Sequence, residues 1–309
     1  MKETTRHIKR SIISSDIKRN KYIYLMVLAV VVWYVIFCYV PMYGTVIAFK
    51  KYSVGLGIFK SSWVGIDNFT AFFRDVNSWR IIKNTLLISI YDILWGFPAP
   101  IILALLLNEV KNKFFKRTVQ TLTYLPYFIS TVVVCGIIVD FTSSSGLINQ
   151  LISSFGFEKT NLLSQSGLFR TIFISTNIWQ SIGWNSIIYL AALSNIDPGL
   201  YEAAVMDGAG KWKQLIHVTL PGLTSTIMVL LILRMGSIMS IGFEKIILLY
   251  NPLTYETADV ISSYVYRRGL LNADYSYSTA IGLFNSVINL LFLVGANWLS
   301  KKYTENSLW

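Results

Sequence analysis

The sequence predicts an all-α integral membrane protein with about six transmembrane helices, and three observations support this fold class. Of the 309 residues, 54% are hydrophobic and only 14% are charged, whereas about a quarter of the residues in a soluble domain are charged. The hydrophobic residues form long blocks rather than half-buried stripes. The basic residues lie mostly at the ends of these blocks, as they do in loops that orient a membrane protein.

Six mostly apolar segments are long enough to cross a bilayer, which takes about 20 residues in a helix. They cover residues 22–43, 85–107, 121–140, 169–193, 223–241 and 279–299. We expect them to form one membrane domain over 22–300. An extracytoplasmic loop would cover 42–84, and a cytoplasmic loop would cover 195–221.

Short basic segments set the predicted orientation. They are the arm at 1–21, the second turn near Lys111 and Arg117, and the tail at 301–309. Positive charge is retained on the cytoplasmic side, so both termini are predicted to be cytoplasmic. The loop 42–84 is also basic, but long loops follow this rule less strictly. The net charge of +11 therefore indicates topology and contact with anionic membrane lipid rather than nucleic acid.

Few residues in the chain could hold a metal or a nucleotide. Its two cysteines, Cys38 and Cys135, lie in apolar segments, and its two histidines are far apart. This argues against a disulfide framework and a metal site. The sequence contains no glycine-rich phosphate loop that ends in Gly-Lys-Ser/Thr. A polar basic stretch follows Met1, so we also expect no cleaved signal peptide.

The predicted loop 195–221 carries the signals of two short helices. Asp197 and Pro198 form a helix start, because Asp caps the first turn and Pro suits the first helical position. The helix would cover 200–207 and end at Gly208. A second short helix is predicted over 211–218, ending before Pro221.

The same loop carries a spaced motif. Glu202-Ala203-Ala204 is followed after three residues by Gly208, and after nine more residues by Val218-Thr219-Leu220-Pro221. This resembles the EAA loop of binding-protein-dependent ABC permeases, with valine where that family has isoleucine. The stretches 63–69, 124–126 and 184–193 resemble the sugar-importer branch, particularly permeases for oligosaccharides of complex carbohydrates.

The resemblance implies the fold of a type I ABC importer permease in a bacterial inner membrane. It implies a cytoplasmic coupling helix that sits in a groove of an ATPase subunit. The implied coupling residues are Glu202, Ala203, Ala204, Asp207, Gly208, Leu220 and Pro221. The chemistry of these residues is consistent with such a coupling role. Glu202 offers a carboxylate to a basic group of a partner, and Gly208 allows the chain to turn sharply.

The resemblance also implies partners. They are a second, homologous permease subunit, two ATPase subunits that bind ATP and Mg, and an extracytoplasmic solute-binding protein. Transport would proceed by alternating access, and the chain itself would not be an enzyme. A homodimer of permease subunits is left open.

Polar residues within the predicted spans are candidates for the transport path, since such groups are costly in a membrane. Amides can bond sugar hydroxyls and aromatic rings can stack on sugar faces. For each residue the alternative is packing between helices. The candidates are Asn177, Gln180, Ser181, Trp184, Asn185, Arg234, Ser237, Asn285 and Asn289.

Arg234 is a special case, because an unpaired charge inside a span costs at least about 2.5–3.5 kcal/mol. One interpretation is an internal ion pair, with Asp92 as the partner. The other is contact with an acidic sugar.

Three other functions would leave different marks in the sequence. An ABC permease for a non-sugar solute would carry the same EAA loop. An ion-driven transporter would carry acidic residues within its spans, where Asp92 is the one clear candidate. An intramembrane enzyme would show a His-Glu-x-x-His motif or a Ser–His pair, and neither is visible in the sequence.

Overall fold

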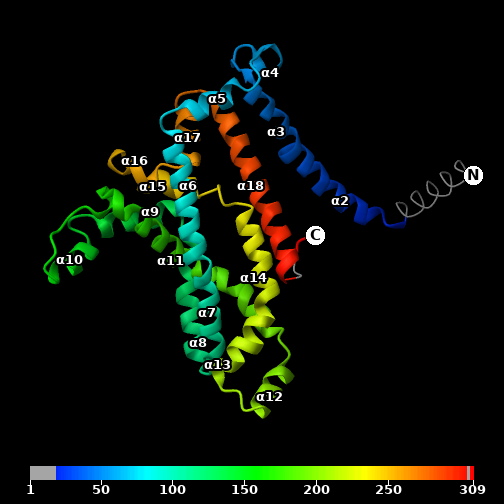
Figure 1. Cartoon of the computed structure of the whole chain (residues 1–309), viewed down its shortest axis with the longest axis vertical. Coiled ribbons are helices and arrows are strands. Elements are labelled where there is room, and N and C mark those ends of the chain that lie inside the picture. Colours follow the sequence, from blue (N-terminus) through cyan, green and yellow to red (C-terminus); the bar gives the residue numbers. More distant parts are fainter. Residues whose placement is uncertain (1–18, 305–306) are drawn as a thin grey trace, which may run out of the picture.

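The computed structural model describes residues 19–304 and 307–309, and these residues are almost entirely helical. Most of the predicted basic arm at 1–21 lies outside the described residues. The molecule is elongated, with α4 and α5 at one end of its long axis and α12 at the other (Figure 1). These elements belong to the two loops that the sequence places on opposite sides of the membrane.

The first span is one long helical segment whose α2 part stands away from the other helices in Figure 1, while its end packs against the last long helix. It comprises α2 (Lys21–Tyr34), the π-helical turn η1 (Val35–Tyr39), α3 (Val40–Met42) and the 3₁₀ helix η2 (Tyr43–Phe49). None of the α2 side chains is buried against the rest of the chain.

The following loop folds into a small cap. Strands β1 (Lys50–Lys51) and β2 (Ser62–Trp63) pair antiparallel, with Lys50 opposite Trp63. They flank α4 (Gly57–Lys60), and α5 (Asp67–Arg74) follows.

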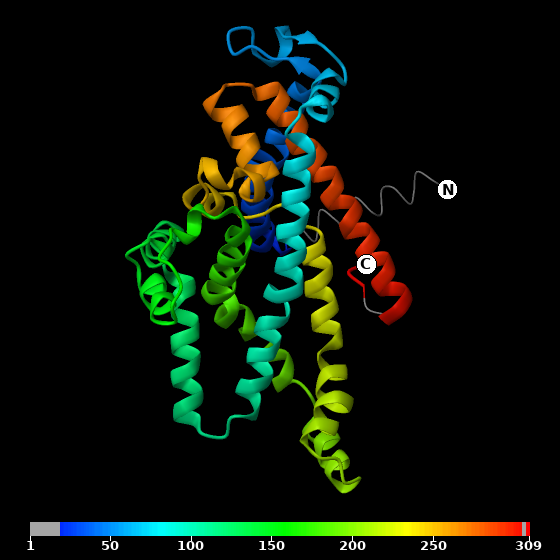
Figure 2. The same ribbon diagram turned by 60° about the vertical axis from the view of Figure 1, so that its left-hand side comes forward.

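The second and third spans form a hairpin that reaches toward the α12 end (Figure 2). The second comprises α6 (Ser78–Tyr91), the π-helical turn η3 (Asp92–Gly96) and α7 (Pro98–Glu109). The third comprises α8 (Lys113–Tyr124), the 3₁₀ turn η4 (Leu125–Phe128) and α9 (Thr131–Thr142). A short helix, α10 (Leu147–Ser154), and the 3₁₀ turn η5 (Leu162–Ser164) follow.

The central helix is α11 (Ser166–Ser194), which packs against α7, α8 and α14. The loop helix α12 (Pro198–Met206) follows it. The chain then forms α13 (Lys211–Gln214), the π-helical turn η6 (Leu215–Thr219) and α14 (Leu220–Met235). Short elements lead to the last long helix, α18 (Tyr275–Thr304). They are α15 (Phe243–Leu249), η7 (Pro252–Thr254), α16 (Tyr255–Ala258), α17 (Ile261–Tyr266) and η8 (Arg267–Leu271).

Five segments of the described chain are long and apolar enough to cross a membrane. They are Lys21–Phe49, Ser78–Glu109, Thr131–Ser154, Lys211–Met235 and Tyr275–Tyr303. The remaining predicted span, 169–193, lies within α11, which is long enough at 29 residues but carries polar side chains along its middle. The chain is therefore an all-α, multi-pass membrane protein, and the count of six spans stays a prediction.

Two predicted spans are interrupted in the structure. The predicted span 121–140 was wrong as a continuous helix, because Ile129 is extended and Ser130 caps a new helix, α9. Pro126 lacks an N–H group and favours such a break. The predicted span 223–241 also ends early, since the α14 helix stops at Met235 and the chain at 240–242 is not helical.

A third correction concerns the second loop helix, which was predicted to end before Pro221. Instead, α13 continues through η6 into α14 without a gap. In the π-helical turn, the N–H of Leu220 bonds the carbonyl of Leu215, five residues back. Pro221 lies at the start of the next regular stretch, where its missing N–H is tolerated.

A glycine lets α11 pack closely on α8. A Cβ atom at Gly183 would lie 2.2 Å from the backbone oxygen of Thr123. The Gly183→Ala variant should therefore lose about 1–3 kcal/mol of stability, the usual cost of overpacking. Its thermal midpoint in detergent should fall accordingly. Gly167→Ala in the same helix is the matched control, because no atom lies within 4 Å of its added Cβ. Equal midpoints for the two variants would contradict this role for Gly183.

Candidate functional site

A cavity of about 890 Å³ lies beside the middle of α11. Its walls come from η3 and the start of α7, from the break before α9, from α11 itself, from the end of α14, and from α15. Six of the nine sequence-predicted path residues line it: Asn177, Gln180, Ser181, Asn185, Arg234 and Ser237. Whether they contact a transported solute stays a prediction.

Four of these residues come from one face of α11. The spacing of Asn177, Ser181 and Asn185 is four residues, which places their side chains in one row along a helix. Gln180 lies in the adjacent row, and its amide donates to the backbone oxygen of Ile129 at 3.3 Å. That carbonyl lies at the break between η4 and α9. The interrupted third span therefore supplies a partner for the polar face of α11.

Arg234 and Asp92 form an ion pair at the cavity wall. The Arg234 side chain is 40% exposed and the Asp92 side chain 17%. A Cβ atom at position 96 would lie 2.9 Å from a carboxylate oxygen of Asp92, so Gly96 leaves the room that this carboxylate occupies. The predicted pairing with Asp92 is confirmed, and the paired Arg234 still faces the cavity.

Lys245, on α15, is a cavity residue that the sequence analysis missed. Its ammonium nitrogen lies 2.6 Å from the amide oxygen of Asn177 and 2.7 Å from that of Gln180. The sequence signal is weak, because Lys245 follows the predicted fifth span and lies outside every predicted span. Gly242, just before α15, is the one indication that the chain turns there.

Tyr127 also lines the cavity and was missed. Its ring stacks on Trp184, with centroids 4.7 Å apart and an interplanar angle of 6°. Trp184 itself does not line this cavity in the described part of the chain. Trp184 packs on Tyr127, which joins Phe97, Phe128 and Tyr189 as the aromatic residues of the cavity wall.

Asn285 and Asn289 of α18 also lie away from this cavity. Asn289 accepts a hydrogen bond from the backbone N–H of Met239 at 2.8 Å and donates to the Ser240 hydroxyl at 2.9 Å. It thereby satisfies backbone and side-chain groups where the α14 span is interrupted. The buried amide oxygen of Asn285 has no hydrogen-bond partner in the described chain.

The predicted coupling loop forms a compact, exposed element at the other end of the molecule. The Asp197 carboxylate accepts from the N–H of Gly199 at 2.8 Å and caps α12, with Pro198 in its first turn. Glu202 and Ala203 are exposed on this helix. Gly208 has a φ of +72°, a left-handed conformation that glycine adopts readily.

The second half of this loop is tied to the fifth span. The Tyr201 hydroxyl lies 3.0 Å from the Thr219 hydroxyl, and Gln214 donates to the backbone oxygen of Ala209 at 2.8 Å. Leu220 and Pro221 open α14. Among residues 19–304 and 307–309, no cluster of three His, Cys, Asp or Glu side chains could hold a metal ion.

Comparison with known proteins decides the family. Residues 96–305 match the family described as the inner membrane component of binding-protein-dependent transport systems. This chain belongs to that family. The match covers the predicted coupling loop, α18 and all of the cavity wall except Asp92, and it makes the chain a membrane component of an ABC-type transport system.

Two relatives from Bacillus subtilis (strain 168) are similar over nearly their whole length. The protein LplB is 46% identical over 293 residues, covering 94% of this chain and 92% of LplB. YteP, a polygalacturonan/rhamnogalacturonan transport system permease protein, is 45% identical over 302 residues, covering 97% and 94%.

A solved structure shares the fold. It is a chain of a bacterial alginate ABC transporter in complex with a periplasmic protein that holds an alginate pentasaccharide. That chain is 46% identical, with a TM-score of 0.88, and the match covers 95% of this chain and 99% of that one.

The ion pair should stabilise the fold in a coupled way. Removing one partner of a buried pair costs about 3–5 kcal/mol, and we expect about 1–3 kcal/mol here because Arg234 is 40% exposed. Asp92→Asn and Arg234→Gln should each lower the unfolding free energy, and the double variant should lose less than their sum. Additive losses in this double-mutant cycle would show that the pair contributes no coupling.

Proposed function

We propose that this chain is a membrane-spanning permease subunit of an ATP-driven ABC importer for an oligosaccharide, acidic oligosaccharides included. The main structural support for this proposal is the cavity beside α11. Its volume of about 890 Å³ falls in the usual range of ligand sites. It combines amides, which suit sugar hydroxyls, with an aromatic ring at Tyr127, which suits a sugar face.

The relatives support a carbohydrate. One is named for polygalacturonan and rhamnogalacturonan transport, and one solved structure concerns import of the acidic polysaccharide alginate. Both are about 45% identical to this chain over more than nine-tenths of its length. An acidic substrate also suits a cavity that contains Arg234 and Lys245.

The partners are part of the proposal. An extracytoplasmic binding protein delivers the sugar, and two ATPase subunits bind ATP and Mg and drive the change between inward- and outward-facing states. A second, homologous permease subunit completes the path. This arrangement is supported by the family and by the exposed α12 element.

The orientation is proposed with both termini in the cytoplasm. It is supported by the basic segments and by the placement of α4 and α12 at opposite ends (Figure 1). A cysteine introduced at Trp309 should react with a membrane-impermeant thiol reagent only after cells are opened. Labelling in intact cells would refute the orientation.

The coupling role of α12 predicts a loss of transport without a loss of insertion. Glu202→Lys reverses a charge presented to the ATPase, and like charges across an interface cost several kcal/mol, enough to lower uptake at least about 10-fold. Gly208→Asp strains a backbone with a φ of +72°. Gly210→Ala is the matched control, since its φ of −68° suits any residue. Normal uptake by both loop variants would exclude α12 as the coupling element.

Reconstitution tests the function itself. The complete transporter in proteoliposomes should accumulate an oligosaccharide when ATP and the loaded binding protein are supplied without an ion gradient. Uptake that needs an ion gradient but no ATP would indicate a secondary transporter. ATP-driven uptake restricted to a non-carbohydrate solute would refute the sugar assignment.

A further inference from the structure

The charges that line the cavity do not cancel. Its charged side chains are Asp92, Arg234 and Lys245, so two cations face one anion. Asp92 is paired with Arg234. Within the described chain, no carboxylate lies within ion-pair distance of Lys245. The cavity wall therefore carries one net positive charge, and Lys245 rather than Arg234 is the cation without an ion-pair partner in the described chain.

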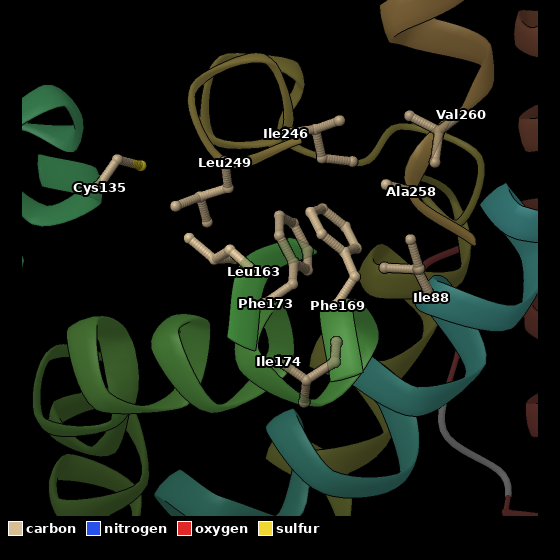
Figure 3. Close-up of a cluster of buried hydrophobic side chains, with 10 residues drawn as sticks. All are labelled: Ile88, Cys135, Leu163, Phe169, Phe173, Ile174, Ile246, Leu249, Ala258 and Val260. Atoms are coloured by element: carbon tan, nitrogen blue, oxygen red, sulfur yellow. The ribbon is translucent and has the colours of Figure 1, made fainter. Parts of the chain in front are cut away.

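Lys245 is held in place from both sides. The next residue, Ile246, and Leu249 on the same short helix are buried in the apolar cluster drawn in Figure 3. Figure 3 shows both side chains directed toward Phe169, Phe173 and Leu163. On the cavity side, the ammonium bonds the amide oxygens of Asn177 and Gln180. Packing thus fixes α15, while Lys245 reaches the polar face of α11.

A carboxylate could replace the amide oxygens in the two hydrogen bonds that the Lys245 ammonium donates. An ammonium group has three N–H donors, and two are used on neutral amide oxygens. In the described part of the chain, the third donor has no hydrogen-bond partner. A carboxylate forms shorter and stronger bonds with an ammonium than an amide oxygen does. A carboxylate that enters the cavity can therefore replace or join the amides at little cost.

Arg234 is less suited to this task. An incoming carboxylate would have to compete with Asp92, which already occupies the guanidinium, and would be repelled by it. The pair is close to neutral as a unit, so its effect on a charged solute is small. Lys245 has no such competitor in the described chain.

We propose that Lys245 is the specificity-determining residue through which the cavity selects sugars that carry a carboxylate. The inference rests on the proposed carbohydrate import and names the group that recognises the acidic class. The carboxylate of a uronate unit binds the Lys245 ammonium, and Asn177 and Gln180 are released to bond sugar hydroxyls. The Asp92–Arg234 pair holds the wall of the cavity.

A purely structural role for Lys245 is the competing explanation, since its bonds join α15 to α11. The two roles differ in what they do to neutral sugars. Loss of the hydrogen bonds that join α15 to α11 would weaken binding of acidic and neutral sugars alike. Loss of a carboxylate-binding group would weaken only the acidic ones.

The test compares trigalacturonate with its trimethyl ester, which has the same length and no charge because all three carboxylates are esterified. Binding of each radiolabelled sugar to the purified complete transporter is measured without binding protein, so that delivery does not enter. ATP-driven uptake in proteoliposomes follows. Lys245→Gln keeps an N–H donor for the α11 amides but removes the charge, and Lys245→Arg keeps the charge. Lys301→Gln, at an exposed lysine far along α18, is the matched control.

We expect Lys245→Gln to weaken trigalacturonate binding about 10- to 100-fold, the usual worth of a hydrogen bond to a charged group. Binding of the methyl ester should stay within about 2-fold of wild type, well below the effect of one such bond. Lys245→Arg should keep most of the preference for the acid, and Asp92→Asn/Arg234→Gln should keep that preference even if total binding falls.

Three results would overturn the proposal. Equal weakening of acid and ester by Lys245→Gln would make Lys245 a structural staple, and no change in either would remove it from the site. A wild-type transporter that binds the ester at least as well as the acid would refute selection of carboxylates while leaving carbohydrate import intact. A transporter that takes up neither sugar but another class of solute would refute the proposed function itself.

Discussion

The ion pair between Arg234 and Asp92 is the interaction on which the cavity depends. It joins the end of α14 to η3 and so fixes the interrupted fifth span against the π-helical turn of the second. Without it, each charge would lie inside a membrane span unpaired, at a cost of at least about 2.5–3.5 kcal/mol. The pair also sets the electrostatics of the site, because it neutralises the arginine and leaves Lys245 as the cation that a solute meets.

Interrupted helices follow from the same requirement for polar partners. Non-helical backbone at membrane depth is tolerated only where it lines a cavity or is buried in protein. The break at Ile129 offers its carbonyl to Gln180, and the break after α14 is satisfied in part by Asn289. At each irregular stretch, a side chain on a neighbouring helix forms a hydrogen bond with a backbone group that helical bonding leaves free. These side chains were visible in the sequence as polar residues within apolar spans.

The sequence predicted the class of fold, the first loop helix with its turn at Gly208 and most of the polar cavity wall, because hydropathy, helix-start signals and residue spacing are local properties. The row Asn177, Ser181 and Asn185 could be found from helical spacing alone. Lys245 and Tyr127 could not, because α15 and η4 reach the cavity only through breaks that apolar windows do not show. Trp184 is predicted to line the path because a tryptophan among amides suits a sugar, and in the structure one face of its ring stacks on Tyr127. That stacking depends on the position of another span.

The unbroken passage from α13 through η6 into α14 makes the fifth span a lever. From Lys211 to Arg234 a helix rises about 1.5 Å per residue, giving an arm of about 35 Å. A tilt of about 3° at the α12 end would therefore displace the far end by roughly 2 Å, a geometric consequence of that length. This displacement is comparable to the difference between a hydrogen bond made and one broken. A small rotation imposed on the loop is thus amplified mechanically into a change of contacts at the cavity wall, with no flexible linker to absorb it.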